Sequence, residues 1–219
     1  MKLLIFDLDG TIIDSSEDLL NAVNFALENR GFHSISYEFL KLHIGEPLEK
    51  VFCFAINKNN LSMEDGILFQ LRKDFVSYSK KHLIDNSKIF DGLENFLRKE
   101  KSQLQVIATT KPTYIAKKIA HLMGFEKYFQ RIFGCEKLPP KPDPSLINHI
   151  LKYFSLKPEE ALMIGDTDKD LLAGKLAGVK TCLALYGFGD KVKSLSLRPD
   201  YVINSPEELN LLISSFPAI

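Results

Sequence analysis

The sequence predicts an α/β fold with a doubly wound parallel sheet and an inserted all-helical domain. From residue 90 onward, short apolar runs alternate with segments of helical periodicity, as strands and helices do in a parallel sheet. Over residues 16–83 helical periodicity continues without any strand pattern, whereas an ordinary crossover between parallel strands holds a single helix. We therefore expect an α/β core of residues 1–15 and 84–219 and a helical cap domain of residues 16–83.

The composition is that of an ordinary globular protein. Its 219 residues, 45% of them hydrophobic, suffice for a substantial core. Lys plus Arg and Asp plus Glu both number 28, so the formal net charge is +0 and no global field favours nucleic acid or an anionic membrane. The three cysteines are widely spaced without a metal-ligand pattern, so we expect reduced thiols.

Two features bear on the compartment. Asp7 and Asp9 interrupt the N-terminal apolar run long before a signal-peptide core would be complete. No window approaches the roughly 18 uncharged apolar residues that a membrane-spanning helix needs. We therefore expect a cytoplasmic monomer or homodimer that binds neither nucleic acid nor a membrane.

The first predicted strand ends in two carboxylates. Residues 3–6 are consecutive apolar residues, as in a central parallel strand covered on both faces. Asp7 and Asp9 follow, and Leu8 between them places both carboxylates on one face of a continuing strand, close enough to share a cation. Gly10 lets the backbone turn. The alternative interpretation is an acidic strand-to-loop turn without chemistry.

The cap is predicted to be a series of helices. Apolar residues at helical spacing predict helices over residues 16–30, 37–42, 48–55 and about 67–78. Ser15 and Asp18 have the spacing of a capping box at the start of the first helix, and Gly31 ends that helix. Residues 82–87 are polar and are expected to be the hinge that returns the chain to the core.

The core then alternates between strands and helices. Strands are predicted at residues 104–108, 132–133, 162–164, 181–185 and 201–203. Helices are predicted at residues 113–123, 144–154 and 171–177, with a final one after residue 205. Asp143 is expected to cap the helix that begins at Pro144, and Ser205 the last helix. This order describes a Rossmann-like core without internal repeats.

Polar residues at two further places are candidates for the crevice that open parallel sheets form at the carboxyl ends of their strands. Thr109 and Thr110 follow the strand at 104–108, where a hydroxyl and backbone N–H groups would face Asp7, although a threonine at a strand end is often only a turn residue. Lys141 precedes a helix, and the prolines around it restrict its backbone. The alternative for Lys141 is a solvated lysine before a helix.

Three aspartates crowd the end of the strand at 162–164. They are Asp166, Asp168 and Asp170. Their mutual repulsion calls for a cation, and oxygen ligands with room for water suit Mg²⁺. The later Glu and Gly positions of an EF-hand calcium loop are absent. We expect Asp168 to face solvent.

These motifs resemble those of the haloacid dehalogenase superfamily, in the family's order and almost from end to end of the chain. The matching segments are Asp7-Leu8-Asp9-Gly10-Thr11, Thr109-Thr110, Lys141-Pro142 and Gly165-Asp166 with Asp170. The helical insert directly after the first motif is similar to the cap of phosphoglycolate-phosphatase-like members. Two further segments resemble the same members, namely Phe90-Asp91-Gly92-Leu93 and Tyr186-Gly187-Phe188-Gly189.

The resemblance implies a role for each matching residue. Asp7 would be the nucleophile and Asp9 the acid/base. The residues implied to bind the phosphoryl group are Thr109, Thr110 and Lys141. The implied Mg²⁺ ligands are Asp7, Asp9 and Asp166, with Asp170 as a supporting carboxylate that does not touch the metal directly. Related phosphatases commonly have Asn at the position of Thr110, so its contribution is expected through its backbone N–H.

One loop of the cap also resembles the family. The segment that contains Gly45 and Glu46 is similar to a loop that related enzymes fold over the substrate. A helix-breaking turn explains these residues equally well.

The resemblance implies a Mg²⁺-dependent phosphatase that hydrolyses a small phosphorylated metabolite through an aspartyl-phosphate. Phosphoglycolate is the leading substrate, followed by inorganic pyrophosphate and sugar phosphates. A β-phosphoglucomutase-type isomerase is disfavoured because residues 15–18 occupy the region where that family pattern places a His, and a dehalogenase is disfavoured by Asp9. A non-catalytic phosphate-binding regulatory protein is expected to have lost one of the core motif residues, and none is lost.

Overall fold

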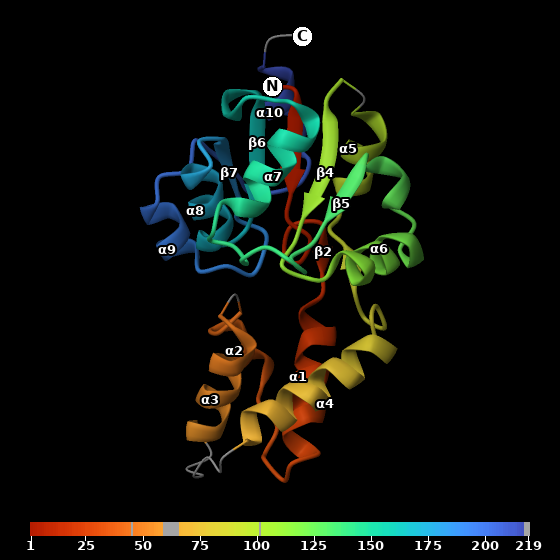
Figure 1. The fold of residues 1–219 in the computed structure, drawn as a ribbon, viewed down its shortest axis with the longest axis vertical. Coiled ribbons are helices and arrows are strands. Elements are labelled where there is room, and N and C mark those ends of the chain that lie inside the picture. The colour runs from red at the N-terminus through yellow and green to blue at the C-terminus, as the bar shows by residue number, and fades with distance from the viewer. Residues whose placement is uncertain (45, 59–65, 101, 217–219) are drawn as a thin grey trace. The chain divides into compact units, whose positions relative to one another are not determined.

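The chain divides into two compact units. The computed structural model describes residues 1–44, 46–58, 66–100 and 102–216 (Figure 1). One unit comprises residues 1–14 and 88–219, and the other comprises residues 15–87. The functional division into a catalytic core and a cap, with limits at 15/16 and 83/84, stays a prediction.

The first unit is built on a six-stranded sheet in the order β5-β4-β1-β6-β7-β8, with every neighbouring pair parallel. Its strands are β1 (Leu3–Phe6), β4 (Leu104–Ala108), β5 (Arg131–Phe133), β6 (Ala161–Gly165), β7 (Lys180–Ala184) and β8 (Tyr201–Ile203). The chain runs outward from β1 first toward β5 and then toward β8, so the topological switch point lies beside β1. The predicted doubly wound parallel sheet is confirmed.

Helices cover both faces of this sheet (Figure 1). Leu3 and Ile5 of β1 pack in one apolar cluster with residues of α7 (Ser145–Phe154) and α8 (Asp168–Leu176). Phe6 points to the opposite face, because side chains alternate along a strand, and its ring lies 6.3 Å from that of Phe96 in α5 (Leu93–Lys99). Burial on both faces explains why β1 is uniformly apolar.

This unit contains further helices and strands. They are β2 (Ile13–Asp14), β3 (Lys88–Ile89), α6 (Thr113–Leu122), α9 (Lys191–Ser196), α10 (Glu208–Ser214) and two single 3₁₀ turns at Glu126–Tyr128 and Pro158–Glu160. β2 and β3 pair antiparallel, and neither was predicted, because two residues give no alternation pattern. Pro144 is the N-cap residue of α7 instead of its first helical residue, and the Ser145 N–H donates to the Asp143 carboxylate at 2.8 Å.

The second unit contains α1 (Ser16–Glu28), α2 (Tyr37–Lys41), α3 (Leu48–Lys58) and α4 (Ile67–Lys81), and no strand among its described residues. Its apolar core gathers side chains from all four helices. The predicted capping box is wrong: the Asp18 carboxylate instead accepts from the backbone N–H groups of Asn86 and Ser87, each at 2.9 Å. Across the described part of the chain, no helix is long and apolar enough to cross a membrane.

Candidate active site

The site is built at the carboxyl ends of the central strands. Asp7 directly follows β1, Thr109 follows β4 and Asp166 follows β6, so the three residues meet beside the switch point. The Asp7 N–H continues the pairing of β1 with β6 by donating to the Ile164 carbonyl at 2.9 Å. Strand pairing therefore fixes the backbone of Asp7 before its side chain makes any contact.

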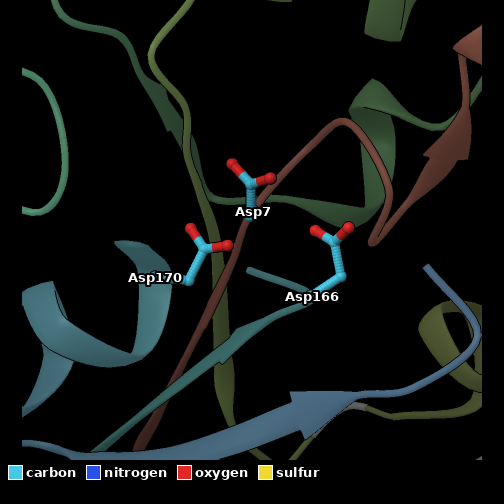
Figure 2. Close-up of side chains that lie close together, drawn as sticks. All are labelled: Asp7, Asp166 and Asp170. Atoms are coloured by element: carbon cyan, nitrogen blue, oxygen red, sulfur yellow. The ribbon is translucent and has the colours of Figure 1, made fainter. Parts of the chain in front are cut away.

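Three carboxylates converge in this place. Asp7, Asp166 and Asp170 each offer an oxygen, and these three oxygens lie within 4.8 Å of one another. Figure 2 shows the three side chains lying close together, Asp7 on the β1 end, Asp166 on the β6 end and Asp170 on α8. All three residues are buried, with exposed fractions of 8%, 2% and 1%. Buried carboxylates at such distances repel one another, so the group requires positive charge.

Lys141 supplies part of that charge. Its ammonium donates to Asp7 Oδ1 and to Asp170 Oδ1, each at 2.5 Å, and to the Ala108 carbonyl at 3.0 Å. The Lys141 side chain is 3% exposed. The Lys141 ammonium therefore bridges the carboxylate that follows β1 and one carboxylate of α8.

Burial dominates the protonation of these groups. It raises the pKa of Asp7 to about 7, partly opposed by the charge of Lys141, while the charge of Asp170 adds to the rise. Burial likewise raises the pKa of Asp166 well above its ordinary value, helped by the charges of Asp170 and Asp7. Burial disfavours the Lys141 ammonium, but the Asp170 and Asp7 carboxylates outweigh it and raise the pKa of Lys141.

The donor set fits a hard divalent cation. Three carboxylate oxygens within reach of one another are the ligands that Mg²⁺ prefers, and their combined charge exceeds that of the single ammonium bonded to two of them. The group includes Asp170, which the sequence analysis placed outside direct metal contact, and does not include the Asp9 carboxylate. The individual ligand roles of these aspartates stay predictions.

Comparison with known proteins identifies the family. A model of the haloacid dehalogenase-like hydrolases matches residues 4–184. The chain belongs to this family. The family predicted from the motifs is therefore confirmed.

Relatives across the whole chain are phosphatases. The chain is 31% identical over 214 residues to a phosphoglycolate phosphatase of Chromobacterium violaceum, covering 95% of each chain, and 30% identical to one of Aquifex aeolicus, covering 98% of each. A haloacid dehalogenase-like hydrolase of Streptococcus pneumoniae has a similar structure, with a TM-score of 0.86, 27% identity and coverage of 97% and 98% of the two chains. A predicted phosphoglycolate phosphatase of Haemophilus somnus matches the fold with a TM-score of 0.90 at 24% identity, over 97% and 98%. The chain is thus a phosphatase of the haloacid dehalogenase-like family.

Asp170 carries a signal that sequence reasoning could have used. Thr167 and Asp170 form a capping box at the start of α8, in which Asp170 Oδ2 accepts from the Thr167 hydroxyl at 2.6 Å and from its N–H at 3.1 Å. The other oxygen, Oδ1, accepts from Lys141. The Thr-x-x-Asp spacing predicts this return of the carboxylate toward the strand end.

Lys111 was not assigned a role from the sequence. Its ammonium donates to Asp9 Oδ2 at 2.5 Å, and the two side chains are 35% and 26% exposed. Its backbone N–H donates to the Thr109 hydroxyl oxygen at 3.2 Å, and its carbonyl accepts from the Cys135 N–H at 3.2 Å. The loop after β4 therefore holds Lys111 at a fixed place beside Asp9.

Thr109 and Thr110 differ in environment. Thr109 is 1% exposed and its N–H donates to the Phe133 carbonyl at 3.0 Å, whereas Thr110 is exposed. The hydroxyl is accordingly the group through which Thr109 would bind a phosphoryl oxygen. The expectation for Asp168 is wrong: its carboxylate contacts Lys193 Nζ at 2.8 Å and its side chain is only 16% exposed.

The predicted substrate loop lies in the helical unit. Gly45 is outside the described residues. Glu46 is half-buried, and its carboxylate lies 3.4 Å from Lys50 Nζ. Within this unit a small cavity of about 110 Å³ is lined by His43, Ile44 and Glu46 together with apolar side chains of all four helices. The helical unit thus has room for a small group beside Glu46.

Proposed function

We propose that this phosphatase hydrolyses phosphoglycolate in a Mg²⁺-dependent reaction that passes through an aspartyl-phosphate on Asp7. The observation that carries the proposal is the buried group of Asp7, Asp166, Asp170 and Lys141 beside the switch point of the sheet. Full-length relatives named phosphoglycolate phosphatase support the substrate. Inorganic pyrophosphate and sugar phosphates carry the same phosphoryl group and are the alternatives.

The first step is attack by Asp7 on phosphorus. Because Oδ1 of Asp7 accepts from Lys141, we assign the attack to Oδ2. The bond from phosphorus to Asp7 forms as the bond to the leaving oxygen breaks, and Asp9 donates a proton to that oxygen. Asp9 suits this part because its partly exposed carboxylate lies outside the buried group of aspartates.

The second step releases phosphate. A water molecule attacks the phosphorus of the aspartyl-phosphate, Asp9 accepts a proton from that water, and the Asp7 carboxylate leaves. The products are inorganic phosphate and the regenerated enzyme.

Two side chains would stabilise the transferring phosphoryl group. The Lys141 ammonium offsets the repulsion between the Asp7 anion and an incoming phosphate, and the Thr109 hydroxyl donates to a phosphoryl oxygen. Asp7, Asp166 and Asp170 would hold the Mg²⁺, with Asp9 as a further predicted ligand. When bound, the metal supplies positive charge to the phosphoryl oxygens.

We assign the choice among phosphorylated substrates to the helical unit. All of the motifs that handle the phosphoryl group lie outside residues 15–87. The cavity beside Glu46 supports a selective role for that residue, and a role for Gly45 stays a prediction from the resemblance.

A screen of phosphorylated metabolites tests the proposal. Phosphoglycolate, sugar phosphates and pyrophosphate are incubated with the wild type in Mg²⁺ and in excess EDTA, with Asp7→Asn as the control for contaminating phosphatases. The expected result is the highest kcat/KM for phosphoglycolate, loss of activity in EDTA and no turnover by Asp7→Asn. Full activity in EDTA, or no release of phosphate from phosphoglycolate, overturns the proposal.

A further inference from the structure

Asp166 is stabilised differently from the other two carboxylates of the site. Lys141 pairs with Asp7 and Asp170, whereas within residues 1–44, 46–58, 66–100 and 102–216 no lysine or arginine forms an ion pair with Asp166. Asp166 is nevertheless only 2% exposed. A buried carboxylate without a cation must be held by hydrogen bonds.

Those hydrogen bonds come from the loop after β7. The backbone N–H groups of Phe188 and Gly189 donate to Asp166 Oδ2 at 2.8 and 3.2 Å. The Thr11 hydroxyl donates to the other oxygen, Oδ1, at 3.3 Å. Two N–H groups on one oxygen fix the rotation of the carboxylate and leave Oδ1 as the oxygen better able to bind a cation.

Two glycines allow the loop to approach this closely. A Cβ at position 187 would lie 2.3 Å from Asp166 Cβ and 2.3 Å from the Gly10 carbonyl oxygen. A Cβ at position 189 would lie 2.1 Å from the Asp166 carbonyl oxygen. Neither glycine has a positive φ, so the requirement is for space and not for a left-handed backbone.

Aromatic contacts hold the loop against the rest of the α/β unit. The Tyr186 hydroxyl donates to the Thr11 carbonyl at 3.0 Å. The ring of Phe90, which follows β3, lies 4.9 Å from the Tyr186 ring and 6.2 Å from that of Phe188. The Phe90 N–H in turn donates to the Ile12 carbonyl at 3.1 Å. The loop is therefore held at Tyr186, which precedes the N–H groups that bind Asp166, and at Phe188, which supplies one of them.

We propose that the segment Tyr186–Gly189 is a positioning element for Asp166, which aims one carboxylate oxygen at the Mg²⁺ site. Tyr186, Gly187 and Gly189 are positioning residues that touch neither substrate nor metal. The inference rests on the proposed function, in which Asp166 is a Mg²⁺ ligand.

The test measures Mg²⁺ binding to the substrate-free protein by titration calorimetry. Partners that orient a metal ligand typically contribute 10–100-fold to metal affinity. We expect the dissociation constant for Mg²⁺ to rise by about 10–100-fold in Gly187→Ala, and by several-fold in Tyr186→Phe, which removes only a hydroxyl. At saturating Mg²⁺ the KM for substrate should be unchanged.

Matched controls separate positioning from simple destabilisation. In Gly174→Ala the added Cβ would lie 2.8 Å from Thr181 Cγ2, away from Asp166, so it should lower the melting temperature but not the Mg²⁺ affinity. Tyr153→Phe removes the hydroxyl that accepts from Arg131 at 2.9 Å, and should leave Mg²⁺ binding unchanged.

Each outcome has a distinct meaning. If the wild type binds Mg²⁺ and Asp166→Asn does not, but Gly187→Ala and Tyr186→Phe bind it as the wild type does, the positioning inference fails and the proposed function stands. If Gly187→Ala does not fold, the dissociation constants for Mg²⁺ of Tyr186→Phe and Tyr153→Phe are compared, and equal values mean that the positioning inference fails. If the wild type itself binds no Mg²⁺, the proposed function fails and the inference fails with it.

Discussion

Replacing Lys141 with Met tests how the buried charges are balanced. Methionine keeps an unbranched chain of similar length but removes the ammonium. The substitution leaves Asp7 and Asp170 buried without the cation that now bonds to both at 2.5 Å. Removing one partner of a buried ion pair typically costs about 3–5 kcal/mol, because the remaining charge is uncompensated.

The expected change in melting temperature follows from this energy. For a chain of this size, 1 kcal/mol corresponds to roughly 2–4 °C, so metal-free Lys141→Met should melt about 6–20 °C below the wild type. The control is Lys111→Met, in which the lost pair with Asp9 joins side chains that are 35% and 26% exposed. A pair of that kind contributes about 0–1 kcal/mol, so the control should shift by no more than about 4 °C.

The loss should also depend on pH. Burial raises the pKa of Asp7 to about 7 even though the Lys141 charge opposes the rise, so removing that charge moves this pKa further upward. Above pH 7 the Asp7 carboxyl of the wild type ionises beside an ammonium, whereas that of Lys141→Met has to ionise without one. The stability of Lys141→Met relative to the wild type should therefore fall as pH rises above 7. Differential scanning calorimetry at pH 6 and pH 8.5 measures both effects. Equal shifts for Lys141→Met and Lys111→Met at both pH values would refute the reasoning.

Three further predictions concern the same site. Asp9→Asn should lower kcat by about 10²–10⁴-fold, as for a missing general acid/base, and an unchanged kcat in steady-state assays removes Asp9 from the mechanism. Burial raises the pKa of Asp7 from 3.8 to about 7 in the fold, so the protonated carboxyl stabilises the metal-free protein fully at low pH, and this stabilisation is lost as pH rises through 7. Urea unfolding should therefore give a lower free energy of unfolding at pH 8.5 than at pH 5, and the difference should be smaller in Asp7→Asn. A free energy of unfolding that does not change with pH contradicts this prediction. Glu46→Ala should change the ratio of kcat/KM between two phosphorylated substrates, whereas Lys141→Met should depress both alike; equal scaling by Glu46→Ala would place selection elsewhere.

Strand ends could be predicted from the sequence because a strand that is buried on both faces consists of consecutive apolar residues. The runs before Asp7, Thr109 and Asp166 are fully or mostly buried strands, and parallel pairing brings their carboxyl ends together. The place of Lys141 in the site was implied only by the family resemblance, and its contact with Asp170 was not predicted.

Contacts between distant segments could not be predicted in this way. Lys111 and Asp9 lie 102 positions apart, and their pairing depends on the register of β1 against β4, which a single sequence does not reveal. The pairing of Asp168 with Lys193 could not be predicted, because Lys193 belongs to α9, a short helix without a clear apolar period. Asp18 has the spacing of a capping box, but its carboxylate accepts from the backbone N–H groups of residues 86–87 instead.

The central claim is that Asp7 receives the phosphoryl group. The most direct measurement mixes the enzyme with Mg²⁺ and phosphoglycolate labelled at phosphorus, quenches in acid within one turnover, and locates protein-bound label by peptide mass spectrometry. We predict an acyl-phosphate on Asp7, labile to hydroxylamine and absent from Asp7→Asn, that forms and decays as fast as turnover. Release of labelled phosphate within one turnover without any label on Asp7 would contradict the account.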